Sequence, residues 1–169
     1  MKLYLKQEVI SWGDQFSVYD ENQNEVYKAK GEVFTFGKKL HLYDLNGEEV
    51  VYIHQKVLSL LPKFYICEGE EDVAEVIREL TLFKPSYKVT GFDWKVNGDF
   101  TNHDFHITTA EGHGVASVSK KWLTWGDSYE IDIAEDKDVV NALAVVLTID
   151  QVMEIEAAQT AAAASSTNN

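Results

Sequence analysis

Apolar and polar residues alternate along most of the chain, in short runs separated by polar turns. Phe16 and Val18 form one such pair of apolar positions, and comparable pairs recur up to residue 133. A period of two is typical of strands that bury one face. Gly47 and Gly112 suit the turns, because glycine adopts positive φ at little steric cost. The pattern predicts a mainly β protein that contains four hairpins.

The pattern also repeats over a longer distance. A shift of 65 positions aligns residues 40–67 with residues 105–132 without a gap. Identical residues in the two segments are His41 and His106, Gly47 and Gly112, Val50 and Val115, Lys56 and Lys121, Leu58 and Leu123, and Ile66 and Ile131. Chance similarity between two hairpins is the alternative. We predict two related halves, at about residues 1–80 and 81–133, in which the matched residues occupy equivalent positions.

A Trp-Gly-Asp phrase occurs at residues 12–14 and again at 125–127, each time before an aromatic residue and an alternating run. Glycine permits a tight bend, and the aspartate can accept hydrogen bonds from nearby backbone amides. We interpret each phrase as a turn that starts a strand, with its tryptophan as a packing residue.

The alternation stops at residue 139, where the sequence reads VVNALAVVLTI. This stretch is apolar on nearly every side of a helix, so the helix must be enclosed. We predict a helix over residues 137–156, started by Asp136 or Asp138 as the N-cap. The core residues that we expect on it are Val140, Leu143, Val146 and Leu147.

The apolar stretch is too short to span a membrane. Residues 138–149 would extend about 18 Å as a helix, against a hydrocarbon core of about 30 Å. A closed sheet around the helix would supply apolar contacts from every direction and would leave no exposed strand edges. We therefore predict a barrel with a central helix in one domain over residues 1–156, followed by a disordered tail over residues 157–169.

Charge and cysteine content bound the partners and the compartment. The chain has 28 acidic and 15 basic residues, for a formal net charge of −13. Its long-range field opposes binding to nucleic acid, which we exclude as a partner. Cys67 is the only cysteine, and the N-terminus lacks the apolar stretch of a secretory signal. We expect a cytoplasmic protein.

No pattern of catalytic residues is present in the sequence. There is no nucleophile elbow, no phosphate-binding glycine loop, and no cysteine with an evident base. Asp104 and His106 share a face of a predicted strand, and His113 follows in the next turn, but a tight zinc site usually has three or four well-placed ligands. We predict a non-enzymatic protein with no catalytic residues, no cofactor and no metal site.

Lysines are the candidate contacts to a phosphate-bearing ligand. The candidates are Lys28, Lys30, Lys38, Lys39, Lys120 and Lys121, with Trp122 as a possible anchor at a membrane interface. If the fold gathers these lysines, they can bind an anionic lipid headgroup as point charges. The alternative is that they are scattered and serve only solubility.

Several motifs resemble those of the LOR (LURP-one-related) family. They are "YKVTGFDW", "HDFHITTAEGHGVASVSKKWLTWGDSYEIDI" and "ALAVVLTIDQV", and "LHLYDLNGEEVVYIHQKVLSLLPKFYI" fits the same pattern in the first half. The resemblance covers residues 3–156. It implies a tubby C-terminal-like and phospholipid scramblase-like fold, with about twelve antiparallel strands around a hydrophobic C-terminal helix.

The resemblance does not carry an activity with it, because one fold hosts many functions. We expect a non-enzymatic binding or scaffold domain that contacts a phosphoinositide or other anionic lipid, or a protein, through its surface. Membrane contact would be peripheral at most. The alternative is a barrel that holds a small apolar ligand, although a helix inside the barrel leaves little room for one.

Overall fold

The computed structural model describes residues 1–8, 13–81, 84–123 and 126–166. Trp12 and Trp125 of the repeated phrase lie outside these residues. Gly13 of the first phrase is described, and its φ of 92° fits the predicted tight bend.

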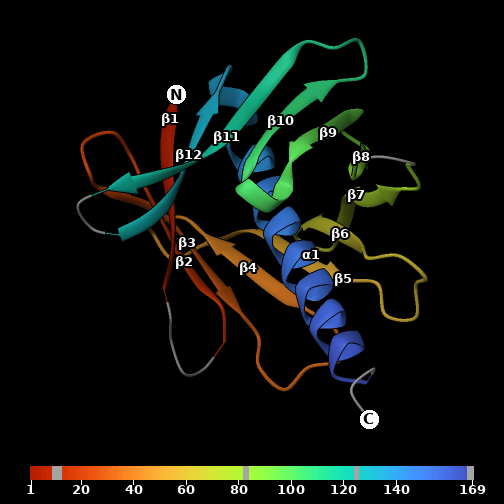
Figure 1. The fold of residues 1–169 in the computed structure, drawn as a ribbon. Coiled ribbons are helices and arrows are strands. Elements are labelled where there is room, and N and C mark those ends of the chain that lie inside the picture. The colour runs from red at the N-terminus through yellow and green to blue at the C-terminus, as the bar shows by residue number, and fades with distance from the viewer. Residues whose placement is uncertain (9–12, 82–83, 124–125, 167–169) are drawn as a thin grey trace.

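Twelve antiparallel strands form a closed barrel around one helix (Figure 1). The strands are β1 (Lys2–Glu8), β2 (Gln15–Tyr19), β3 (Glu25–Gly31), β4 (Lys39–Tyr43), β5 (Glu49–Gln55), β6 (Lys63–Glu68), β7 (Glu71–Glu79), β8 (Ser86–Thr90), β9 (Trp94–Asp99), β10 (Asp104–Thr109), β11 (Gly114–Leu123) and β12 (Gly126–Ile133). Each strand pairs with its neighbours in sequence, and β1 pairs with β12 to close the barrel. The predicted fold class is confirmed.

Helix α1 (Val139–Ser166) follows β12 and passes through the barrel, as the blue ribbon in Figure 1 shows. The described residues also form two short 3₁₀ helices, η1 (Phe100–Asn102) and η2 (Asp136–Asp138). Within the described residues, no helix is long and apolar enough to cross a membrane.

The core forms where inward-facing strand residues meet the helix. Alternation along the strands turns residues such as Leu5, Phe16 and Ile53 inward, and each is fully buried. On the helix, the predicted core residues Leu143, Val146 and Leu147 are buried, and Val140 is half-buried and packs against the same core.

The helix is longer than the sequence pattern predicted. We expected it to end at residue 156 and a disordered tail to follow, but the helix continues to Ser166, and residues 157–165 are exposed. The extension is rich in alanine, which has the highest helix propensity, and it contains no glycine or proline. Thr160 and Ser165 are compatible with this helix, because their hydroxyls donate to backbone carbonyls about one turn earlier. Loss of hydrophobic periodicity was therefore the wrong criterion for the end of the helix.

Equivalent pairs of residues confirm the repeat. Ile53 pairs with Ile66 between β5 and β6, and Val118 pairs with Ile131 at the same offset between β11 and β12. Ile66 and Ile131 are both fully buried. The turns also match, because the amide of Gly47 donates to Asp44 at 3.1 Å and the amide of Gly112 donates to Thr109 at 3.0 Å.

The boundary between the halves differs from the predicted one. Because β6 matches β12, the halves are β1–β6 and β7–β12, and the boundary lies at residues 69–70 rather than near residue 80. The tight turn at Gly69 joins β6 to β7 as a hairpin, so the sequence continues through the boundary with no change of pattern.

Candidate functional site

The connections between strands lie alternately at the two ends of the barrel, because neighbouring strands are antiparallel. We call the apolar end the one that carries the connections 32–38, 56–62 and 80–85, together with residues 13–14 and 100–103. The opposite end is the acidic end. Its connections are residues 20–24, 44–48, 69–70, 91–93, 110–113 and 134–138.

Large apolar side chains protrude from the described connections of the apolar end. Phe34, Phe36, Leu58, Leu60 and Leu80 are 89–104% exposed. They come from three separate connections, so no single disordered loop accounts for them. Exposed apolar groups that are concentrated at one end of a molecule are typical of an interaction site.

The backbone of these connections is unusual where the apolar side chains protrude. Phe34 and Leu58 adopt the left-handed region, with φ of 59° and 66°. Residues other than glycine, asparagine and aspartate rarely adopt this region, and bulky ones pay a steric cost for it. Gln23 of the acidic end also has positive φ, at 66°, so it is the apolar exposure of Phe34 and Leu58 that distinguishes these connections.

Lys38 fastens the first of these connections to the helix. Its ammonium group lies 2.8 Å from a carboxylate oxygen of Asp14 and 2.8 Å from one of Glu154. Burial alone would lower the pKa of Lys38, but the hydrogen bonds to the two carboxylates outweigh it and raise the pKa. Lys38 is therefore a structural cation. Figure 1 shows the helix leaving the barrel beside the 32–38 connection.

Two other carboxylates near the apolar end are also paired with cations. Glu32 lies 3.4 Å from Lys39, and Glu156 on the helix pairs with Arg78 on β7. Their negative charge is largely neutralised locally. Lys56 and Lys84, in the second and third connections, are exposed.

The acidic end has the opposite composition. Its connections carry Asp20, Glu21, Asp44, Glu48, Glu70, Asp93, Glu111, Glu135, Asp136 and Asp138, with Lys137 as their lysine. Several of these carboxylates hold the turns together, as at Asp44, which accepts from the amides of Asn46 and Glu48 at 2.8 and 2.9 Å. The hydrogen bond from the amide of Glu48 is the main reason that the pKa of Asp44 is lowered. This end stays charged and hydrated.

The structure places most of the predicted lysine contacts toward the apolar end, on separate strands. Lys30 is the next-to-last residue of β3 and Lys39 is the first of β4, on either side of the connection that contains Lys38. Lys120 and Lys121 lie late in β11, toward the same end. Lys28 lies earlier in β3, further from the apolar end, and its ammonium group is 3.7 Å from Glu25.

These lysines do not form one patch. In the barrel order, β2, β1 and β12 separate β3 from β11, and Lys121 is 3.8 Å from Glu130. The side chain of Trp122 lies outside the described residues. The predicted headgroup cluster is therefore replaced by lysines distributed around the rim of the apolar end.

The five exposed apolar side chains of the apolar end were not identified from the sequence. Their signal was present, since "VFTF" and "VLSLL" place apolar residues in segments that join two strands. Apolar residues in these two segments could equally belong to a strand or to the core. Only the strand order of the barrel shows that the segments are connections.

A cavity that the described residues line beside the helix is too small for an apolar ligand. A cavity beside the helix, among Leu5, Phe105, Val146 and Asp150, has a volume of about 10 Å³. A space of that size is at the lower limit for one water molecule. The structure gives no support to the alternative of a ligand-holding barrel.

Comparison with known proteins agrees with the fold. A sequence model of the LURP-one-related family matches residues 1–150. The chain is 38% identical over 153 residues to "Uncharacterized protein YxjI" from Bacillus subtilis (strain 168), across 90% of this chain and 94% of that protein. The X-ray structure of a protein from Arabidopsis thaliana is similar with a TM-score of 0.60 and 22% identity, across 88% of this chain and 90% of that one.

Proposed function

The chain belongs to the LURP-one-related family, and from that premise we propose that it is a non-enzymatic membrane-docking domain that rests on an anionic bilayer through its apolar end. The observation that carries the proposal is the protrusion of five almost fully exposed apolar side chains from three connections of that end. A cytoplasmic location and the absence of catalysis remain predictions.

The form of the apolar end favours a bilayer over a folded protein partner. Phe34, Leu58 and Leu80 protrude from different connections with little around them. A protein interface needs a complementary, closely packed surface, whereas a fluid bilayer accommodates separate protruding side chains. Trp, Phe and Leu on such protrusions are the side chains that enter the boundary between headgroups and acyl chains.

Insertion of these side chains into a bilayer can supply enough free energy for binding. Complete burial of one Leu or Phe side chain yields about 1.5–3 kcal/mol. Four of them, Phe34, Phe36, Leu58 and Leu60, would together contribute roughly 6–12 kcal/mol, and micromolar binding requires about 8 kcal/mol. Partial insertion therefore gives reversible, peripheral attachment.

The net charge of −13 does not oppose this orientation, because much of it lies at the acidic end. The seven residues of β3 extend roughly 20 Å between the two ends. The Debye length at physiological ionic strength is about 8 Å, so the acidic end is screened from the lipid surface. The rim lysines of the apolar end act at close range and favour anionic lipids.

The exposed end of helix α1 is compatible with the same orientation. It leaves the barrel near Lys38 and Glu154, at the apolar end. After Glu156 the sequence contains no charged side chain and is rich in alanine. This segment can lie at the level of the headgroups without the cost of burying a charge.

Co-sedimentation with vesicles tests the proposal. The wild type should bind vesicles of phosphatidylcholine with phosphatidylserine more tightly than vesicles of phosphatidylcholine alone. Phe34→Ser/Phe36→Ser and Leu58→Ser/Leu60→Ser should each weaken binding by tenfold or more, because each removes two inserting side chains.

The acidic end supplies a matched control. Leu45 is also an apolar residue in a connection, and it is 69% exposed, so Leu45→Ser should leave binding unchanged. Equal loss in all three variants, or no effect of the four apolar-end substitutions, would contradict the proposal. If the wild type bound neither kind of vesicle, a protein partner would become the preferred explanation of the exposed apolar side chains.

A further inference from the structure

A row of stacked rings covers the outer face of β4, β5 and β6. His41 stacks on Tyr52 with ring centroids 4.8 Å apart, and His54 lies between Tyr52 and Tyr65 at 5.3 and 5.2 Å. The two tyrosines hold the imidazole of His54 in a fixed orientation. A side chain that is positioned in this way loses little conformational freedom when it binds a ligand.

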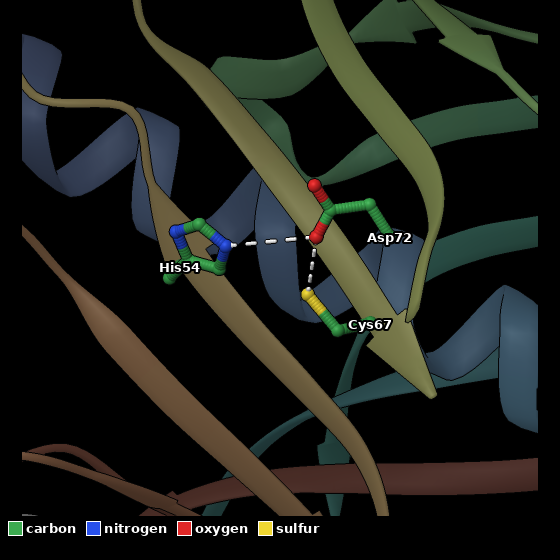
Figure 2. Close-up of side chains that lie close together, drawn as sticks. All are labelled: His54, Cys67 and Asp72. Carbon is green, nitrogen blue, oxygen red and sulfur yellow. Dashed lines mark hydrogen bonds and ion pairs between the residues drawn. The ribbon is translucent and has the colours of Figure 1, made fainter. Parts of the chain in front are cut away.

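Three adjacent strands bring His54, Cys67 and Asp72 together (Figure 2). His54 lies on β5, Cys67 on β6 and Asp72 at the start of β7. The register between β6 and β7 shifts between Ile66 and Cys67, so that Cys67 pairs directly with Asp72. The trio thus depends on a β-bulge, a feature that often re-aims a side chain at a functional position.

The donor atoms of the trio lie at distances that suit one metal ion. The thiol of Cys67 donates to Asp72 Oδ1 at 3.0 Å, and His54 Nε2 lies 3.9 Å from the same oxygen. All three donor atoms fall within 4.8 Å of one another. Bonds of about 2.0–2.3 Å in a tetrahedral zinc site separate the ligand atoms by roughly 3.3–3.7 Å, so small side-chain rotations would complete the site.

The surroundings of the trio are those of a site with one open side. Cys67 is 5% exposed, His54 is half-buried and Asp72 is exposed. The sulfur is therefore shielded, while solvent reaches the carboxylate. A metal bound by these three groups has a fourth position that water can occupy.

The donor types select the class of metal. A thiolate and an imidazole favour Zn²⁺ and similar transition metals, whereas Mg²⁺ and Ca²⁺ prefer oxygen ligands. One thiolate and one carboxylate would also balance the charge of a divalent ion. We propose that His54, Cys67 and Asp72 bind one Zn²⁺ ion, with water as the fourth ligand.

This site is independent of the proposed membrane function. Cys67 and Asp72 flank the 69–70 turn of the acidic end, and His54 lies near the end of β5, two residues before the 56–62 connection. None of the three is one of the five protruding apolar side chains. Zinc would join β5, β6 and β7 on the outside of the barrel. Loss of metal binding would leave vesicle binding intact, and loss of vesicle binding would leave metal binding intact.

Titration of the reduced protein with Co²⁺ tests the proposal. Co²⁺ replaces Zn²⁺ and reports a thiolate ligand through its charge-transfer absorption. One equivalent should produce this absorption, Zn²⁺ should abolish it by displacement, and Mg²⁺ should not. Cys67→Ser should eliminate the absorption, and His54→Gln or Asp72→Asn should weaken binding by a hundredfold or more.

His41→Gln is the matched control, because His41 belongs to the same row of rings but binds Glu32 and Glu49 instead. It should keep the absorption and the affinity. Asp72 is exposed, so Asp72→Asn tests the site without a risk to folding, and circular dichroism checks the other variants. Absence of charge-transfer absorption in the wild type would overturn the proposal, as would tight binding that survives in Cys67→Ser or Asp72→Asn.

Discussion

The two ends of the barrel are built from the same strands and have opposite surfaces. The acidic end closes its turns with carboxylates such as Asp20 and Asp44, which accept hydrogen bonds from backbone amides of the same turn. The apolar end has connections in which the apolar side chains of Phe34 and Leu58 protrude and are almost fully exposed. Turns like those of the acidic end are sufficient to connect strands. The exposed apolar side chains of the other end therefore need a different explanation, and binding provides one.

The largest expected effect concerns the barrel that both ends share. Leu143→Asp places a carboxylate where the wild-type side chain is fully buried. An unpaired charge in an apolar core costs several kcal/mol, which is comparable to the whole stability of a domain. The variant should be unfolded by circular dichroism and should lose every property of both ends. A folded Leu143→Asp protein would show that the helix is not the core of the barrel.

Asp150→Asn should have the next largest effect, on the part of the helix that lies toward the apolar end. Burial, together with Glu154 and Asp14, raises the pKa of Asp150 to about 7 despite the opposing effect of Lys38. The folded state therefore holds a proton that the unfolded state releases near pH 4. The free energy of unfolding falls as pH rises between these two values. The fall is complete above pH 7 and amounts to about 4 kcal/mol.

The variant removes this loss, so Asp150→Asn should raise the free energy of unfolding at pH 8 and change it little at pH 4. Urea unfolding of both proteins at the two pH values measures the difference. Equal stabilisation at pH 4 and pH 8 would contradict the role of a protonated Asp150.

Charge reversal at the rim should weaken membrane binding by a smaller amount. Each lysine near an anionic surface contributes about 1 kcal/mol. Lys120→Glu/Lys121→Glu should lower the affinity for anionic vesicles by tenfold or more. Lys88 and Lys95 are exposed and lie opposite each other on β8 and β9, outside the connections, so Lys88→Glu/Lys95→Glu is the control and should have little effect. A similar loss in both pairs would mean that net charge, and not the rim, determines binding.

Salt should have the smallest effect. Raising the salt concentration from 50 to 200 mM shortens the Debye length from about 14 Å to about 7 Å and screens the rim lysines. Wild-type binding should weaken a few-fold and then level off, because apolar insertion does not depend on screening. Binding that disappears completely at 200 mM would indicate an electrostatic contact without insertion.

The sequence predicted the barrel more completely than it predicted the site. Alternation and the all-round apolar helix are one-dimensional signals, and the offset between Ile66 and Ile131 correctly placed two equivalent strands. The apolar end depends on which connections meet in space. Phe34 and Leu58 lie in different hairpins, so no local pattern marks them as neighbours at one end.

The trio of His54, Cys67 and Asp72 was missed for a related reason. Local spacing in the sequence points only to Asp104, His106 and His113 as candidate ligands, and from these it predicts no metal site. Cys67 faces Asp72 only because the register shifts at the bulge. A shift of one residue in strand pairing is invisible in a single sequence, although it determines which side chains share a face.

The most direct test of the central claim compares the environment of the two ends on a membrane. A polarity-sensitive fluorophore is attached to a single cysteine in a Cys67→Ser background, at Phe36→Cys on the apolar end or at Leu45→Cys on the acidic end. With anionic vesicles, the label at position 36 should shift to shorter emission wavelength and be quenched by lipids that carry a quencher in the acyl chain, and the label at position 45 should show neither change. Equal responses at both positions, or no response at position 36 while the protein sediments with vesicles, would contradict docking through the apolar end.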